Sequence, residues 1–274
     1  MQKPDWRLIT SLPAPGAWNM ALDEAILDSV IAGEQPPTFR LYAWEPACLS
    51  LGHAQPILDV DLDALKKHAW NLVRRPTGGR AILHTDELTY SICAHQDSPV
   101  MSGGILESYR RISLALVHGL ENIGIQANAD SQYAVPAGST PNASVCFEVP
   151  SNYEITANGK KLIGSAQARR NLGVLQHGSL PLYGDLARIT EVLDFTDSES
   201  QTLAKQRLLR HAITAENVLG FAPTWEQAAQ AMITAFSEQM GVNLILSEPS
   251  PAELQRTEEL RAKKFSNPAW TFRF

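Results

Sequence analysis

Hydrophobic and polar positions along the first third of the chain predict short strands. Apolar blocks bounded by turn residues occur at FRLYAWE (39–45), CLSLGHA (48–54), NLVRRP (71–76), RAILH (80–84) and LTYSICAH (88–95). Blocks of this length, rich in aromatic and β-branched residues, are typical of strands. A further strand is predicted at GVLQHGSLPL, residues 173–182.

Other segments have the spacing of amphipathic helices. Residues 19–33 begin with Asn19 as the expected cap and end at Gly33, and residues 60–69 form a short helix. Residues 105–124 predict the strongest helix, and residues 224–241 predict another within a mostly helical part from about residue 197. The apolar stripe of the strongest helix comprises Ile105, Tyr109, Ile112, Leu116, Leu120 and Ile123.

The segment NYEITANGKKLIGSAQ predicts a β-hairpin. Asn158-Gly159 fits a type I′ turn between two strand-like stretches. A two-residue turn sets Thr156 opposite Lys161, so Lys160 and Lys161 project to opposite sides of the hairpin. The pattern alone does not choose which lysine faces a site.

Central strands, one long packing helix and a helical C-terminal third predict an α/β (α+β) fold, in which a mixed β-sheet is flanked by helices. The sequence has no internal repeat, low-complexity tract or long linker. We therefore expect one catalytic domain over residues 1–274, with a mostly helical C-terminal part at 197–274.

Composition narrows the class of protein. Hydrophobic residues make up 44% and charged residues 19%, the balance of a globular protein. No apolar run approaches the ~20 residues that span a bilayer, and the N-terminal stretch has Pro and Asp where a secretory signal has its apolar core. We expect a cytoplasmic protein without a membrane partner.

Charge and cysteine usage exclude further classes. A net charge of −6 argues against broad nucleic-acid binding, which depends on neutralising phosphates. Adjacent Lys/Arg pairs nevertheless hold 12 of the 23 basic residues, which indicates an anionic ligand or an acidic partner. The three cysteines have no CxxC spacing, so we expect neither a disulfide framework nor a metal site.

Two segments carry candidate chemistry. In RRPTGGRAILH, two glycines between strands let a ligand lie against the main chain, with arginines nearby, although a Gly-Gly turn is most often only a turn. Cys146 follows a Pro/Gly/Ser/Asn-rich loop, where reactive side chains are commonly displayed. Its thiol needs a nearby positive charge to be a nucleophile at neutral pH. A lysine of the hairpin can supply that charge only if the segment around Pro150 folds back, because ten extended residues span about 33 Å. Cys48 and Cys93, inside strands, are expected to be inert and buried.

Taken together and in order, several segments resemble the lipoate/octanoate side of the biotin–lipoate protein ligase superfamily. They are FRLYAWEPACLSLGHAQ, RRPTGGRAILH, ELTYSI, GKKLIGSAQ and LQHGSLPL, within about residues 7–195. The stretch SVCFEVPSNYEI followed by NGKKLIGSAQ is most similar to the cysteine-dependent octanoyltransferases of the Gram-positive type. The resemblance implies the catalytic-domain fold of that superfamily.

The resemblance also implies site residues. Cys146 matches the cysteine that forms an acyl thioester, and Lys161 matches the functional lysine that lowers the pKa of this thiol and contacts the acyl carbonyl. Lys160 stands where the family more often has Arg. The residues implied to line the acyl and carrier-arm pocket are Arg75, Gly78, Gly79, His84, Gly164, Ser165, His177 and Gly178.

The implied reaction transfers an octanoyl group from octanoyl-acyl carrier protein to the target lysine of a lipoyl domain or the glycine cleavage H protein. It uses no cofactor. The first alternative is an ATP-dependent lipoate-protein ligase, which activates a free acid as an adenylate with magnesium and ATP and needs no cysteine. The others are an amidotransferase that moves octanoyl between lipoyl domains, a non-catalytic carrier-protein binder, and a DNA-binding repressor, for which residues 1–18 offer no helix-turn-helix.

Overall fold

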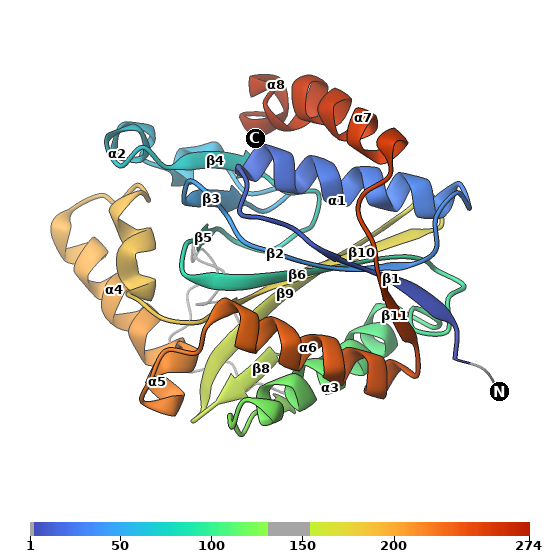
Figure 1. Cartoon of the computed structure of the whole chain (residues 1–274). Helices are drawn as coiled ribbons and strands as arrows, with labels where there is room; N and C mark the ends of the chain where they lie inside the picture. Colours follow the sequence, from blue (N-terminus) through green and yellow to red (C-terminus); the bar gives the residue numbers. More distant parts are fainter. Residues whose placement is uncertain (1–2, 131–153) are drawn as a thin grey trace.

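A computed structural model describes residues 3–130 and 154–274 (Figure 1). Within the described chain, eight strands form one mixed sheet in the order β11-β1-β2-β6-β10-β9-β8-β7. β1 pairs in parallel with β11 and β2, and the pairs from β2 to β7 are antiparallel. These strands are β1 (Asp5–Thr10), β2 (Thr38–Tyr42), β6 (Glu87–His95), β7 (Asn128–Asp130), β8 (Glu154–Ala157), β9 (Lys160–Arg170), β10 (Gly173–Pro181) and β11 (Asn243–Leu246).

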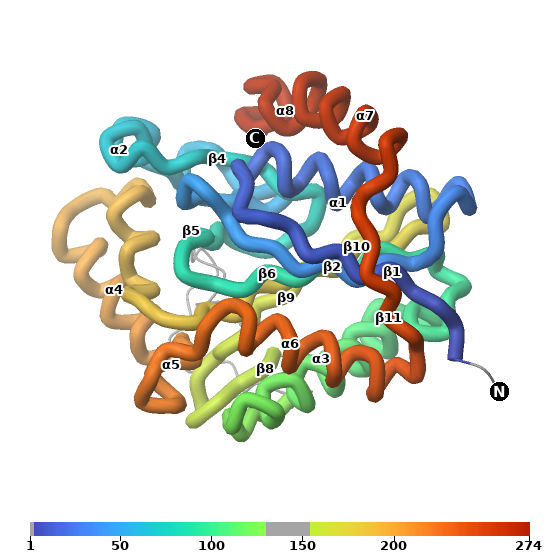
Figure 2. The backbone as a smooth tube through the Cα atoms, in the orientation of Figure 1, coloured from blue at the N-terminus to red at the C-terminus, as the bar shows by residue number. Residues whose placement is uncertain are grey.

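Helices cover both faces of this sheet (Figure 2). On one face α1 (Gly16–Ile31) packs on β6 and β10, and α7 (Pro251–Leu260) packs on α1. On the other face α3 (Ile105–Asn122) and α6 (Trp225–Met240) lie side by side. The larger core lies beneath these two helices and includes the stacked rings of Phe39 and Phe236, whose centroids are 4.3 Å apart. The expected mixed sheet flanked by helices is confirmed.

A smaller sheet of three strands stands beside the large one. It has the order β4-β3-β5, with β3 (Cys48–Leu51) parallel to β4 (Asn71–Arg74) and antiparallel to β5 (Ile82–His84). Its own core includes Leu49, Leu51 and Val60. The remaining helices are α2 (Leu62–Lys67), α4 (Ser198–His211), α5 (Ala215–Leu219) and α8 (Pro268–Thr271), with 3₁₀ helices at Ile57–Asp59 and Leu186–Glu191 and a π-helical turn at Arg261–Phe265.

Two helix predictions need correction. α1 begins at Gly16 with Pro15 as its N-cap, so Asn19 lies inside the helix, where its side-chain amide donates to the carbonyls of Ala14 and Ala43. The stripe predicted on α3 begins too early, because Ile105 is half exposed at the first turn. Ile112, Leu116 and Leu120 are buried as expected, and small buried residues between them let α6 approach closely.

The hairpin prediction is confirmed in register. Asn158 and Gly159 have φ angles of 51° and 71°, as a type I′ turn requires, and Thr156 pairs with Lys161. The two lysines diverge as expected. Lys160 reaches outward to the carbonyl of Leu209, whereas the side chain of Lys161 is buried.

No helix in the described part of the chain is long and apolar enough to cross a bilayer.

Candidate active site

A largely apolar cavity of about 270 Å³ lies between the two sheets. Its volume is just below the usual range for pockets that bind small molecules. Apolar side chains from α1, β2, β5 and the segment after β2 line one part of it, and polar side chains from both sheets line the rest. The lining residues are Met20, Tyr42, Trp44, Ser50, Arg75, Gly79, Arg80, Ile82, His84, Thr89, Lys161, Gly164, Ser165, Ala166, His177, Gly178 and Ser179.

Lys161 places a positive charge on the wall of this cavity. Its Nζ lies 2.6 Å from Oε1 of Glu154, and both side chains are only 4% exposed. The pair is possible because both residues project from the same face of the β8–β9 hairpin. A buried ammonium held beside an apolar cavity stabilises negative charge that develops nearby far more than an ammonium in water does.

His84 is held on two sides by hydrogen bonds. Its Nδ1 lies 2.7 Å from Oε1 of Glu87, and its Nε2 lies 2.7 Å from Oγ of Ser50. The Trp44 ring stacks on the imidazole at 3.9 Å between centroids. Oγ of Ser179 also donates to Glu87, at 2.8 Å. Burial raises the pKa of Glu87, but the adjacent His84 and the hydrogen bonds outweigh it, so the pKa lies below its ordinary value and the carboxylate is ionised at neutral pH.

Arg75 clamps the glycine loop to the small sheet. Its guanidinium donates to the carbonyls of Ser50, Gly78 and Arg80 at 3.0, 2.9 and 2.7 Å. Gly79 has a φ of +94°, a conformation that favours glycine. Gly78 is not among the residues that line the cavity. It lies on a surface depression that also contains Gly79 and Arg80, so these two residues connect the depression with the cavity wall.

The neighbouring Arg74 is directed away from the cavity. Its guanidinium donates to the carbonyls of Gly52, Gln55 and Thr271, and it is fully buried. The alternation of a strand explains this split, since neighbouring side chains point to opposite faces. Only Arg75 of this basic pair therefore serves the cavity.

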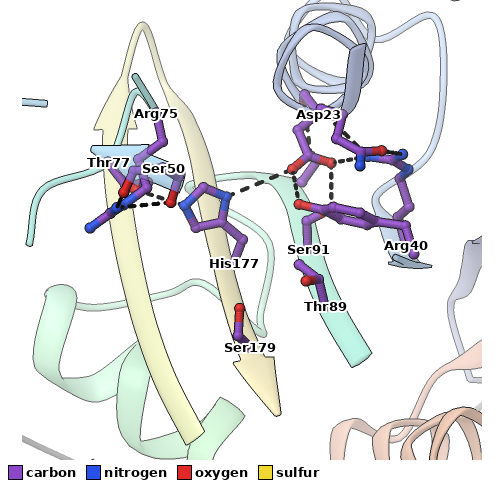
Figure 3. Close-up of polar contacts among 12 residues, drawn as sticks. Asp23, Arg40, Ser50, Arg75, Thr77, Thr89, Ser91, His177 and Ser179 are labelled. Atoms are coloured by element: carbon purple, nitrogen blue, oxygen red, sulfur yellow. Dashed lines mark hydrogen bonds and ion pairs between the residues drawn. The ribbon is translucent and has the colours of Figure 1, made fainter. Parts of the chain in front are cut away.

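His177 links the cavity to a buried charge cluster (Figure 3). Its Nε2 lies 2.6 Å from Oγ1 of Thr77, and its Nδ1 lies 3.7 Å from Oδ2 of Asp23. Asp23 in turn pairs with Arg40 at 2.8 Å. Burial lowers the pKa of His177, so the imidazole is neutral at pH 7. Burial raises the pKa of Asp23, but Arg40 and the hydrogen bonds bring it below its ordinary value.

The floor of the cavity depends on a glycine of β10. Gly178 pairs with Ser165 of β9. A Cβ at this position would lie 2.5 Å from Oγ of Ser165 and 2.6 Å from Cε1 of Tyr90, so any side chain there forces the two strands and the tyrosine apart. Ser165 itself is held by the hydroxyl of Tyr90 at 2.7 Å.

Eight of the ten residues singled out from the sequence line the cavity: Arg75, Gly79, His84, Lys161, Gly164, Ser165, His177 and Gly178. Gly78 lies on the adjoining depression, and Cys146 lies outside the described residues. Cys48 and Cys93 are fully buried, and burial raises the pKa of both thiols, as expected of inert cysteines. The described residues contain no cluster of three or more His, Cys, Asp or Glu that would hold a metal ion.

Several site residues carry no sequence signal. Met20, Trp44 and Ser50 line the cavity from segments whose patterns predict only a helix or a strand. Glu87 and Glu154, which hold His84 and Lys161, lie in the segments ELTYSI and SVCFEVPSNYEI but were not singled out as site residues. The sequence does not show that their carboxylates are buried against these two groups.

The family described as "Lipoyl protein ligase A/B catalytic domain" matches residues 15–237. The chain belongs to this family. Curated relatives named octanoyltransferase LipM are similar over the whole chain. The protein from Kyrpidia tusciae is 38% identical over 98% of each chain, and that from Bacillus subtilis is 34% identical over the full length of both.

Solved structures of the same family share the fold. A lipoate-protein ligase A bound with ATP superposes with a TM-score of 0.80 and 25% identity over 98% of both chains. A bipartite lipoate protein ligase from Thermoplasma acidophilum gives a TM-score of 0.82 at 24% identity, over 98% of this chain and 96% of that one. That structure comes from a study of an archaeal lipoylation system, the ligase and its E2 lipoyl domain. The expected superfamily fold is thereby confirmed.

Proposed function

We propose that this chain is an octanoyltransferase of protein lipoylation, which takes an octanoyl group from octanoyl-acyl carrier protein and passes it to a lysine of a lipoyl domain or the glycine cleavage H protein. Similarity to octanoyltransferases over the full length of both chains supports the reaction class. The observation that carries the chemistry is the buried Lys161 ammonium on the wall of an apolar cavity.

The reaction proceeds in two acyl transfers through Cys146. In the first, a bond forms between its sulfur and the octanoyl carbonyl carbon, the carbon–sulfur bond to the carrier arm breaks, and the thiol proton goes to the departing arm. In the second, the target amine attacks the carbonyl carbon, the bond to Cys146 breaks, and the thiol is restored. The ammonium of Lys161 stabilises the thiolate and the oxyanion formed in each transfer.

The other cysteines support this assignment by their surroundings. Cys48 and Cys93 are 0% and 1% exposed, and burial raises the pKa of each thiol. Neither belongs to the cavity lining. Thiols in such surroundings are inert as nucleophiles.

The first experiment is intact-protein mass spectrometry after mixing with octanoyl-acyl carrier protein in the absence of ATP. We expect a gain of one octanoyl unit that hydroxylamine removes, in the wild type but not in Cys146→Ser. Cys93→Ser is the matched control: its hydroxyl replaces the thiol that lies 3.4 Å from the Asp23 carbonyl, so the adduct should persist. An adduct of undiminished size in Cys146→Ser contradicts the nucleophile assignment.

An ATP-dependent ligase is the second candidate, since the fold superposes on a ligase bound with ATP over nearly the whole chain. A ligase forms an acyl-adenylate and needs no thioester donor. Incubation with free octanoate, magnesium, ATP and a lipoyl domain tests it. Acceptor modification only in this mixture, with no adduct from the acyl carrier protein, assigns the chain to the ligases.

A further inference from the structure

Three residues on two sheets form a hydrogen-bonded chain that ends at the cavity. Ser50 of β3 contacts Nε2 of His84 at 2.7 Å, and Nδ1 of His84 contacts Glu87 at 2.7 Å. Ser50 and His84 both line the cavity, whereas Glu87 lies behind them. The connectivity is serine to imidazole to carboxylate, although no segment of the sequence has a serine-hydrolase motif.

The partners of His84 fix its tautomer. An ionised carboxylate only accepts hydrogen bonds, so Nδ1 carries the proton and donates to Glu87. In the neutral imidazole Nε2 then accepts from the hydroxyl of Ser50. Oγ of Ser50 also accepts from Arg75 at 3.2 Å, so it can accept from His84 as well once the ring is protonated. His84 therefore takes up a proton at Nε2 without losing either partner.

Glu87 holds the imidazole of His84 by accepting the hydrogen bond from Nδ1. Its carboxylate also accepts from Thr89 and Ser179, which fix its position. The other charged or titratable side chains on the cavity wall are Arg75, which reaches His84 through Ser50, the neutral His177, and Tyr42, Arg80 and Lys161. The arrangement resembles the imidazole–carboxylate pair of a general base, in which the carboxylate orients the ring and stabilises the imidazolium.

Transfer to a lysine needs such a base. The target lysine is an ammonium at neutral pH, with an ordinary pKa near 10.4, and it cannot attack until it loses a proton. The charged Lys161 has three donors and no acceptor, so it cannot receive this proton. The imidazole of His177 also lies on the cavity wall, but it faces the Asp23 carboxylate at 3.7 Å, against 2.7 Å between His84 and Glu87, and burial lowers its pKa.

We propose that His84, oriented by Glu87 and Ser50, is the catalytic base that deprotonates the acceptor lysine in the second transfer. The inference rests on the proposed function, since it presupposes the Cys146 thioester. The ammonium gives one proton to Nε2 of His84, with Ser50 turning aside or relaying it. The free amine then forms its bond to the carbonyl carbon, the bond to the Cys146 sulfur breaks, and the thiolate recovers its proton from the nitrogen of the new amide. The proton on His84 returns to solvent.

A comparison of two nucleophiles distinguishes a catalytic role of His84 from a structural one. Hydroxylamine is largely unprotonated at neutral pH, so it attacks the thioester without help from a base, whereas a lipoyl-domain lysine needs one. The experiment measures formation of the octanoyl adduct, its transfer to the lipoyl domain, and its cleavage by hydroxylamine, each in a single turnover.

In His84→Gln we expect the rate of transfer to the lysine to fall about 10²–10⁴-fold relative to the rate at which hydroxylamine cleaves the same adduct, the usual contribution of general-base catalysis. Glu87→Gln, which keeps the volume of the buried side chain, tests the positioning role without removing the imidazole. It should slow the same step alone. His95→Gln, a partly exposed histidine at the end of β6, is the control and should change no step.

Other outcomes overturn the inference. Equal slowing with both nucleophiles, or loss of the adduct itself, gives His84 a structural role. Unchanged transfer to the lysine shows that it is not the base. A selective loss in Glu154→Gln, with His84→Gln unaffected, assigns the proton to the carboxylate beside Lys161. If the wild type forms no adduct, the proposed function fails, and this inference fails with it.

Discussion

The buried pair of Lys161 and Glu154 allows stability and chemistry to be separated by mutation. At 2.6 Å, with an effective dielectric constant of about 20, the Coulomb attraction is roughly 6 kcal/mol. Much of it offsets the cost of taking both charges out of water. Replacing Lys161 with Met, which has similar length and no charge, leaves the Glu154 carboxylate buried opposite an apolar side chain. Breaking a buried pair in this way costs about 3–5 kcal/mol.

Urea unfolding measures this cost. Lys161→Met should lower the free energy of unfolding by about 3–5 kcal/mol, a large fraction of the 5–15 kcal/mol typical of a protein. Lys161→Met/Glu154→Leu removes both charges and should recover most of the loss, since a buried pair and a well-packed apolar pair are often of similar stability. A loss below about 1 kcal/mol in the single variant, or a double variant no more stable than the single one, refutes the reasoning.

The double variant should regain stability without regaining the activation of Cys146. The double variant is folded but has no ammonium at the cavity, so we expect the Cys146 thiol to return toward its ordinary pKa, near 8.5. Alkylation of Cys146 by iodoacetamide should then require a higher pH than in the wild type. Each tenfold fall in the ratio of thiolate to thiol at a given pH corresponds to about 1.4 kcal/mol of lost thiolate stabilisation. An unchanged alkylation profile means that Lys161 does not activate this cysteine.

Three further outcomes follow from the described contacts. Gly178→Ala should destabilise the protein by about 1–3 kcal/mol and raise the KM for the acyl donor, because the Cβ of the alanine would meet Ser165 and Tyr90. Thermal unfolding measures the first effect and steady-state kinetics the second. Gly78→Ala, whose Cβ has no described atom within 4 Å, should leave the unfolding free energy within about 0.5 kcal/mol of the wild type. The pKa of Asp23 is lowered in the folded state, so the stability it provides is present above the unfolded pKa near 3.9 and is lost as the pH falls through the folded pKa. Urea unfolding followed from pH 5 down to about pH 2 should therefore show a shallower acid loss in Asp23→Asn than in the wild type.

The sequence correctly predicted those elements whose conformation depends on residues close together in the chain. The Asn158-Gly159 turn sets its own backbone conformation and thereby the register of the hairpin, which is why the divergence of the two lysines was predictable. The edge strand β11 and its neighbour β1 had no comparable signal. They pair in parallel across more than 230 residues of sequence, as in Asp5 with Asn243, and each is short. Their existence depends on a partner that the sequence does not identify.

The partners of buried charges could not be predicted for a related reason. The sequence pattern predicts a helix capped by Asn19, but the helix begins about one turn earlier, at Gly16, and Asp23 is buried against Arg40 from β2. The Ser50–His84 contact arises because β3 and β5 pair with Cys48 opposite His84, which makes Ser50 a diagonal neighbour of the imidazole on the same sheet face. A shift of one residue in this register would turn Ser50 to the other face.

Three of the buried carboxylates also explain why a shared fold does not decide between transferase and ligase. Asp23, Glu87 and Glu154 each hold a cation or an imidazole beside one apolar cavity. Such a site can stabilise charge at an acyl carbonyl with either leaving group, a thiol or an adenylate. The residue that we propose distinguishes the two reactions is Cys146, which lies outside the described residues. The decision therefore rests on identity to octanoyltransferases along the full chain, at 34–38%, against 25% for the ligase bound with ATP. A thioester adduct formed without ATP is the measurement that separates them, because adenylate chemistry cannot produce it.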